Sequence, residues 1–359
     1  MIFHRALLRE FAGLAGAVFM TLFAISVTTR LIRLLGDAAG GAIPSDAVVA
    51  FIGFFALGAL PVLLSLTMFI SVLLTLTRSW RDSEMVIWFT SGLPLTAWLK
   101  PVMLFALPQF AVITVLSLFI SPWAAQMGEQ YQSRIKARDD VTRVNPGVFG
   151  ETGNKERVFF VESVSGDSST VQNVFVASVQ QQRTGVSMSR SGHTELAPNG
   201  DRFIVLENGR RYEGTPGDPE YRVTEFDRYA ARIETTEASQ PQQLTHKTQP
   251  TWGLIVNPTN PNLGELLWRI GIPISAMVLV FLAIPMSFVN PRAGRSVNLM
   301  FALATYIVYS NLLSVSQARV AQGRMDFGVG WWIVHALMAL LLVFMFAKRM
   351  QLIRLRLGR

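Results

Sequence analysis

Long apolar runs without a charged residue dominate both ends of this 359-residue chain. Six stretches lack Asp, Glu, Lys and Arg altogether: 11–29, 47–77, 101–128, 270–291, 296–318 and 327–347. Each reaches about 19 residues or more, the length of a helix that crosses a ~30 Å hydrocarbon layer at ~1.5 Å per residue. Because backbone amides find no water partner in lipid, these stretches are predicted to be six membrane-spanning helices.

Between the third and fourth runs the pattern changes to short β-rich stretches separated by turn residues. The stretches cover 157–164, 171–179, 185–190, 202–207, 210–213 and 221–229. Asn208-Gly209, which separates two of them, is typical of a hairpin turn. Strands without intervening helices predict an all-β sandwich, jelly roll or open barrel. The expected domains are a membrane half at 1–128, the all-β domain at 129–262 and a second membrane half at 263–359.

Lysine and arginine residues near the six runs are shared unevenly between two sides of the membrane. One side has twelve, and the other has only Arg30, Arg33, Arg319 and Arg324. Because short cytoplasmic flanks are the basic ones, both termini are expected in the cytoplasm and the β domain outside. Positions 129–269 hold 16 basic and 18 acidic residues, so the net charge of +8 belongs to the membrane halves. This distribution indicates anionic membrane lipids as partners and no nucleic acid.

The residue types that would make this chain an enzyme or an ion-driven carrier are missing from the expected positions. No phosphate-binding loop or dinucleotide fingerprint occurs, there is no cysteine, and the four histidines lack ligand spacing. The six runs contain no Asp or Glu, whereas ion-driven carriers place carboxylates near the middle of the membrane. We therefore expect no catalytic residue, no metal site and no cofactor in the chain, and an energy source outside it.

The longest connection on the basic side, between the second and third runs, is predicted to hold a short helix at about 81–92. Asp82 and Glu84 fall in its expected first turn, where negative charge suits the helix dipole. Met85 and Trp88 lie at helical spacing, so this helix can dock on a partner protein. The alternative interpretation is a surface helix that packs against the spans of its own chain.

Five short motifs spread along the chain carry a family signature. They are Arg5-x-x-x-Arg9-Glu10, Arg30-Leu31-Ile32-Arg33-Leu34-Leu35-Gly36, Ser83-Glu84 with Ser91-Gly92-Leu93, Tyr212-Glu213-Gly214-Thr215 and Val289-Asn290-Pro291-Arg292-x-Gly294-Arg295. Together they resemble the LptF/LptG family of lipopolysaccharide-export permeases along the full chain, most closely its LptF branch. The resemblance implies six transmembrane helices with a periplasmic β-jelly-roll domain between the third and the fourth.

The resemblance also implies a permease subunit of an ABC transporter in the inner membrane of a Gram-negative bacterium. Lipopolysaccharide would leave that membrane through the complex and pass to a periplasmic bridge. The implied partners are the permease LptG, a dimer of the ATPase LptB, LptC and the bridge protein LptA. ATP would bind to the ATPase subunits, so this chain would need no cofactor of its own.

Site residues follow from the same resemblance. Glu84 would be the acid of a coupling helix that meets a basic residue of the ATPase, with Asp82, Met85 and Trp88 beside it. Four arginines would meet the phosphates of the lipid headgroup: Arg30, Arg33, Arg319 and Arg324. The i, i+3 spacing of the first pair places two guanidinium groups on neighbouring positions of one helix, and guanidinium matches phosphate oxygens in a bidentate way. The alternative for this pair is a role as ordinary interfacial anchors.

Two other functions compete with a passive permease. One is a membrane-anchored scaffold whose β domain docks other envelope proteins. The other is a lipid-modifying enzyme, which would need clustered acid, base or metal-ligating residues that the sequence does not show. Purification with associated subunits distinguishes the first two, because only a permease should bring a nucleotide-binding protein with it.

Overall fold

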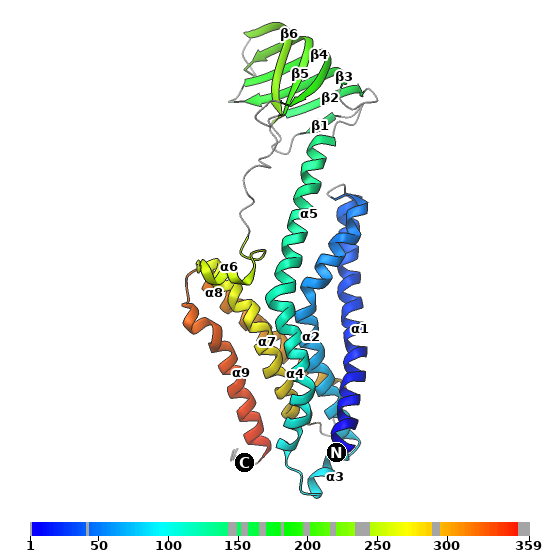
Figure 1. Cartoon of the computed structure of the whole chain (residues 1–359), viewed down its shortest axis with the longest axis vertical. Helices are drawn as coiled ribbons and strands as arrows, with labels where there is room; N and C mark the ends of the chain where they lie inside the picture. The colour runs from blue at the N-terminus through cyan, green and yellow to red at the C-terminus, as the bar shows by residue number, and fades with distance from the viewer. Residues whose placement is uncertain are drawn as a thin grey trace. The chain divides into compact units, whose positions relative to one another are not determined.

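The structure is a computed structural model, and it describes residues 2–40, 43–142, 149–151, 157–164, 170–180, 183–196, 202–215, 220–233, 245–288 and 295–350. They fall into two compact units (Figure 1). The membrane unit comprises Met1–Gln130 and Leu244–Arg359, and the β unit comprises Tyr131–Gln243. The β unit is therefore an insertion with two covalent connections to the membrane unit.

Six described helices of the chain are long and apolar enough to cross a membrane, which confirms the six predicted spans. Five of them are α1 (Ile2–Ala39), α2 (Val48–Arg81), α7 (Asn260–Met286), α8 (Arg295–Ala321) and α9 (Phe327–Arg349). The third span is composite: α4 (Leu99–Val115) continues through a π-helical segment, η3 (Leu116–Ile120), into α5 (Ser121–Thr142). The short helices between spans are η1 (Ser45–Ala47), α3 (Glu84–Thr90), η2 (Leu95–Trp98) and α6 (Thr251–Val256).

The two ends of the membrane unit are distinct. The start of α1, the helix α3 and the end of α9 lie at one end, which we call the α3 end (Figure 1). The helix α6 and the end of α8 lie toward the other end, which we call the α6 end. Each span runs from one end to the other, so movement of a rigid span at one end is accompanied by movement at the other.

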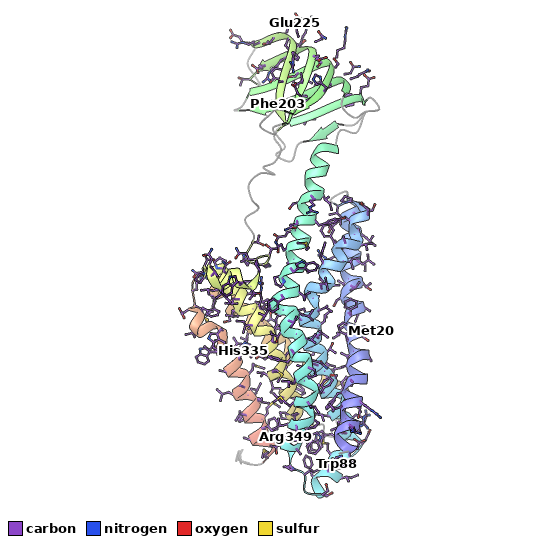
Figure 2. All side chains as sticks on the ribbon, viewed as in Figure 1. Met20, Trp88, Phe203, Glu225, His335 and Arg349 are labelled. Carbon is purple, nitrogen blue, oxygen red and sulfur yellow. The ribbon has the colours of Figure 1, made fainter. Side chains whose placement is uncertain are left out.

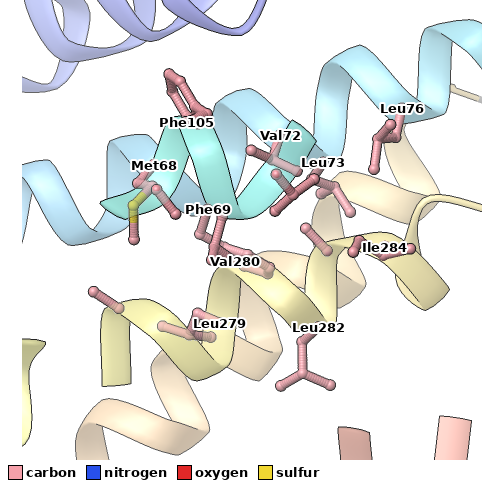
Figure 3. Close-up of a cluster of buried hydrophobic side chains, with 14 of the residues drawn as sticks. Met68, Phe69, Val72, Leu73, Leu76, Phe105, Leu279, Val280, Leu282 and Ile284 are labelled. Carbon is pink, nitrogen blue, oxygen red and sulfur yellow. The ribbon is translucent and has the colours of Figure 1, made fainter. Parts of the chain in front are cut away.

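The hydrophobic core of the membrane unit lies where α2, α4 and α7 meet (Figure 3). Phe69, Val72 and Leu76 repeat every three or four residues along α2, so they share one helix face. They pack in one buried cluster with Phe105 of α4 and Val280 of α7. The most apolar window of α7 is 61% buried, against 22% or less for every other span, so α7 is the central helix.

Close packing of α8 on α7 and of α9 on α8 involves glycines. A Cβ added at Gly271 of α7 would lie 2.8 Å from a methyl group of Leu313 on α8. A Cβ added at Gly330 of α9 would lie 2.6 Å from a methyl group of Val320 on α8. Real Cβ atoms do not come this near, so a side chain at either glycine would force its neighbour to shift.

Large apolar side chains cover the outer faces of several spans. Met20 of α1 is 68% exposed, and Phe119 in η3, Met300 in α8 and Leu340 in α9 are exposed to a similar extent (Figure 2). In water such surface would be unfavourable, whereas in a bilayer it contacts lipid chains or a neighbouring membrane protein. These faces agree with a protein that crosses the membrane several times.

The β unit is a six-stranded antiparallel sheet whose neighbours in space are also neighbours in sequence. The strands are β1 (Phe149–Glu151), β2 (Arg157–Val164), β3 (Thr170–Gln180), β4 (Arg183–Leu196), β5 (Arg202–Gly214) and β6 (Tyr221–Ile233). This confirms an inserted all-β domain. Among the described strands the order is a meander in one sheet, without the crossover between two sheets that completes a jelly roll. Val174 and Leu206 form its buried apolar cluster with partly buried residues around them.

The predicted hairpin at Asn208-Gly209 is wrong. One strand, β5, runs through both residues and keeps the same register with β4 and β6 on either side of them. Asn208 has a φ of 54°, which bends the strand locally without reversing it. A side chain at Gly209 would collide with the ring of Phe226 and the carbonyl of Met188, so the glycine serves close packing rather than a turn.

The β unit begins within two residues of the expected 129–262 but ends well before it, and its first residues are helical. Helix α5 continues to Thr142, because 129–142 contains neither glycine nor proline and is rich in good helix formers. At the other end, 244–262 belongs to the membrane unit, where α6 packs on α7. The β unit, Tyr131–Gln243, is accordingly shorter than the predicted domain at 129–262.

Candidate functional site

The helix expected at 81–92 is two separate elements. Helix α2 extends to Arg81, and the N–H of its C-cap residue Asp82 donates to the carbonyl of Arg78 at 2.9 Å. Ser83 then takes a left-handed conformation, with a φ of 61°, and α3 starts at Glu84. Asp82 therefore ends the second span and is not in the first turn of α3, because Ser83 breaks the helical path between them.

The exposed side of α3 differs from the one expected for docking. Met85 is 1% exposed and belongs to the chain's own hydrophobic core, and Trp88 packs partly buried against that core. Val86 and Ile87 are the large apolar side chains of α3 that face outward, at 51% and 66% exposure. A partner of α3 would meet these two residues and not the side chain of Met85.

A cluster of charges surrounds the start of α3. Arg78 of α2 binds Glu10 of α1 through two contacts, Nε to Oε1 at 2.5 Å and Nη2 to Oε2 at 2.9 Å. It also binds Glu84 twice, at 2.9 and 3.3 Å, and Asp82 once, at 3.1 Å. We call these four residues the Arg78 cluster. It joins α1, α2 and α3 through a single guanidinium group.

The Arg78 cluster is incompletely neutralised and open to water. Arg78 contacts the three carboxylates of Glu10, Asp82 and Glu84, and Arg81 adds one further positive charge 3.4 Å from Asp82, so two cations face three anions. The four side chains are 34–42% exposed. Ion pairs of this exposure are weak and can exchange partners at small cost. Glu84, the expected coupling acid, is thus already held inside its own chain by a contact that can be exchanged.

Aromatic rings connect α3 to the second half of the chain. Phe89 of α3 packs between Trp98 and Trp80, with centroid distances of 5.4 Å to each. Trp80 meets Phe288 edge to face at 4.8 Å, and Arg349 at the end of α9 lies 3.9 Å above the Phe288 ring. Since such contacts favour defined geometries, the α3 end is a packed junction of both membrane halves.

At the other end of α1, Arg30 and Arg33 have different surroundings. Arg30 is half-buried against α2, with its guanidinium carbon 5.5 Å from the centre of the Phe55 ring. Its Nε is buried and has no hydrogen-bond partner among the described residues. Arg33 is exposed. The pair therefore offers one half-buried guanidinium group with an unsatisfied donor, that of Arg30, and one exposed guanidinium group, that of Arg33.

Arg319 and Arg324 come together at the end of α8. The N–H of Arg324 donates to the carbonyl of Arg319 at 2.9 Å, and Gly323 between them has a φ of 69°. This is the glycine-dependent closing turn of a helix. Both arginines are exposed. Arg319 lies in the last turn of α8, which packs mainly on α7 and α9, and Arg324 lies in the turn after it. Arg30 and Arg33 lie on α1, which packs mainly on α2.

The most deeply buried charged residue in the described part of the chain was not predicted from the sequence. Arg269 of α7 is 2% exposed and pairs with Glu265, one turn earlier, at 2.9 Å. Both precede the apolar run at 270–291, which itself contains no acidic residue, so the composition of that run gave no sign of an ion pair in α7. The i, i+4 spacing of the two residues was the available signal.

Arg269 holds together three segments that are distant in sequence. Besides Glu265 it donates to the carbonyl oxygens of His246, Lys247 and Gln249 and to the hydroxyl of Thr251, at 3.4, 3.0, 3.0 and 2.9 Å. The Thr251 hydroxyl donates in turn to the carbonyl of Leu118 in the π-helical segment η3. The Ser117 hydroxyl donates to the carbonyl of Arg269 at 2.8 Å. We call this network the Arg269 junction.

Comparison with known proteins shows the family to which the chain belongs. The family "Lipopolysaccharide export system permease LptF/LptG" matches residues 5–348. The lipopolysaccharide export system permease protein LptF of Escherichia coli strain K12 is 27% identical over 340 residues, which are 93% of this chain and 92% of that protein. The LptF protein of Shigella flexneri matches with the same identity and coverage. With its six spans, its inserted β unit and a match over nearly its whole length, the chain belongs to the LptF/LptG family of lipopolysaccharide export permeases.

Proposed function

We propose that this chain is the LptF-type subunit of an ABC transporter that extracts lipopolysaccharide from the inner membrane. A separate LptB dimer binds and hydrolyses ATP, LptG is the second permease, and LptC and LptA receive the lipid. Both termini and α3 lie in the cytoplasm and the β unit lies in the periplasm, as the distribution of basic flanks indicates. The chain contributes no cofactor site, and its own role is to bind and guide lipid.

The observation that carries this proposal is the construction of the α3 end. A short helix with an acidic start and two exposed apolar residues, Val86 and Ile87, stands between spans two and three. Its buried face joins the core of the membrane unit through Met85. A helix anchored in this way on one side and open on the other can receive force from a cytoplasmic ATPase and pass it to the spans.

Glu84 tests the connection to the ATPase. In the proposed complex its carboxylate leaves Arg78 and pairs with a basic residue of LptB. Loss of one partner of such a desolvated pair costs about 2–5 kcal/mol. Glu84→Ala should therefore lower the amount of ATPase subunit that copurifies, or separate ATP hydrolysis from lipid export, while the spans still insert.

The matched control is Glu225→Ala, an exposed acid on β6 whose ion pair with Arg210 is 61–74% exposed. It should copurify and export like the wild type. Normal export by Glu84→Ala would contradict the coupling role. Failure of the wild-type chain to copurify with any nucleotide-binding protein would contradict the permease and favour a membrane-anchored scaffold.

The arginines near the α6 end are proposed to contact lipid phosphates. The buried Nε of Arg30 has no acceptor among the described residues, and a phosphate oxygen would supply one. Substitution of Arg30 or Arg33 by Lys should preserve part of the export, Ala less, and Glu least, because a carboxylate repels phosphate. Export measured at equal protein level checks this order, and equal tolerance of all three replacements would identify the pair as interfacial anchors.

A further inference from the structure

We propose that Glu10 is a positioning residue of the transport cycle, which ties α1 to the coupling helix α3 through Arg78. The inference rests on the proposed function. It assigns a role to a residue of the first sequence motif that the permease proposal leaves unused. Its consequence is that α1 connects the ATPase-facing end of the unit to Arg30 and Arg33.

The first step is the geometry of the shared guanidinium. Arg78 binds Glu10 in a fork, at 2.5 and 2.9 Å, and binds Glu84 in a second fork, at 2.9 and 3.3 Å. Paired N–H···O contacts fix the relative orientation of both partners, which a single contact to lysine would not. Glu10 lies 68 positions before Arg78 in the chain, so this contact links separate spans.

The second step is that a new ion pair at Glu84 alters the ion pair between Arg78 and Glu10. When a basic residue of a partner pairs with Glu84, Arg78 loses one of its carboxylates and its remaining charge faces Glu10 and Asp82. The cluster is 34–42% exposed in the free chain, so its ion pairs are weak enough for Glu84 to exchange Arg78 for another cation. The guanidinium group of Arg78 then moves with the carboxylate of Glu10, and the start of α1 changes its position relative to α3.

The third step is that α1 can carry this change across the membrane. It is one continuous helix, Ile2–Ala39, and contains no proline, unlike α2, α4 and α7. At about 1.5 Å per residue, Glu10 and Arg30 lie about 30 Å apart along it. Its buried residues are Leu7, Phe11 and Ala15 toward the α3 end and Leu34 at the α6 end, and half-buried residues between them alternate with exposed ones along α2. A continuous helix without proline, whose main neighbour is the single helix α2, can tilt as one body.

Spin labels measure the expected tilt. Ile32 of α1 and Val49 of α2 are 65% and 77% exposed, so cysteines at these positions accept labels without disturbing the core. This chain contains no cysteine of its own. The full complex, with cysteines removed from its other subunits, is reconstituted with lipopolysaccharide, and the distance between the labels is measured with and without trapped nucleotide.

We expect a nucleotide-dependent distance change in the wild-type complex and its loss in Glu10→Gln, with ATP hydrolysis retained and less lipid released per ATP. Glu10→Asp, which keeps the charge, should retain the distance change. Asp37→Asn is the matched control, because it removes an exposed carboxylate from the same helix outside the cluster. Arg78→Lys offers a second variant should Glu10→Gln not accumulate, and it should weaken the change because lysine cannot form both forks.

The inference is overturned if Glu10→Gln, or Arg78→Lys in its place, shows the wild-type distance change. It is also overturned if a complex that hydrolyses ATP and exports lipid shows no change at these labels. Absence of an ATPase subunit from the purified wild-type complex would instead contradict the proposed function. The two failures are therefore distinguishable.

Discussion

Replacing Arg269 by Met removes the guanidinium from the Arg269 junction but keeps an apolar side chain of similar length. Glu265 is then left buried without its cation, and the carbonyls of His246, Lys247 and Gln249 lose their donors. Removal of one partner from a buried ion pair costs about 3–5 kcal/mol. Because the hydrogen bonds form one network, their separate energies do not add to this figure.

The loss of stability should be concentrated at 245–251, the segment that connects the β unit to α6 and α7. Positions 245–251 depend on Arg269 for their contact with α7, so their local opening equilibrium should shift by roughly 150-fold to several thousand-fold. Amide hydrogen exchange of this segment, in detergent or nanodiscs, measures the shift directly. Combining Arg269→Met with Glu265→Met should recover part of the loss, since it removes the unpaired charge but not the unpaired carbonyls.

Lys247→Met is the matched control for this measurement. Its side chain is exposed, and its backbone carbonyl, which accepts from Arg269, is unchanged. We expect exchange at wild-type rates in this variant. Less than a tenfold increase of exchange in Arg269→Met would refute the reasoning, because it would mean that the buried network does not hold the segment.

Two further outcomes follow from the packing of α8 and α9. Tyr309→Phe removes the 2.6 Å hydrogen bond to Nδ1 of buried His335. It should lower the unfolding free energy by about 0.5–2 kcal/mol, the range for hydrogen bonds between membrane helices. A thermal midpoint equal to that of the wild type would contradict this. Gly271→Leu should cost about 1–3 kcal/mol by overpacking against Leu313, whereas Gly16→Leu, where a Cβ meets nothing within 4 Å, should leave the thermal midpoint unchanged.

The features that could be predicted from sequence are those that depend on length and local composition. Six uncharged runs reveal six spans because crossing a bilayer needs a minimum apolar length, whatever the helices touch. The stretch at 157–164 coincides with β2 because it is bounded by turn residues on both sides. Arg30 and Arg33 were identifiable as candidates since positive charge is sparse on their side of the membrane, but the half-burial of Arg30 depends on Phe55 of another helix.

The features that could not be predicted depend on contacts between distant residues. Asn208-Gly209 has the composition of a hairpin, but β5 pairs with β4 and β6 on both sides of it, and the ring of Phe226 packs where a side chain at Gly209 would be. Met85 has the spacing of a docking residue, and its burial depends on the core of the unit. In both cases local preference was outweighed by tertiary packing.

The two arginine networks of the membrane unit differ in how easily they can rearrange. Arg269 is 2% exposed and donates five hydrogen bonds, so any new partner would have to replace all of them inside a dry site. Arg78 is 37% exposed and shares its donors among three carboxylates, so water or a partner's cation can replace one contact at a time. Movement during transport is therefore expected to begin at the Arg78 cluster, while the Arg269 junction stays intact and keeps the return segment on the central helix α7. A transport cycle that opened the Arg269 junction first would need the larger of the two energies before any lipid moved.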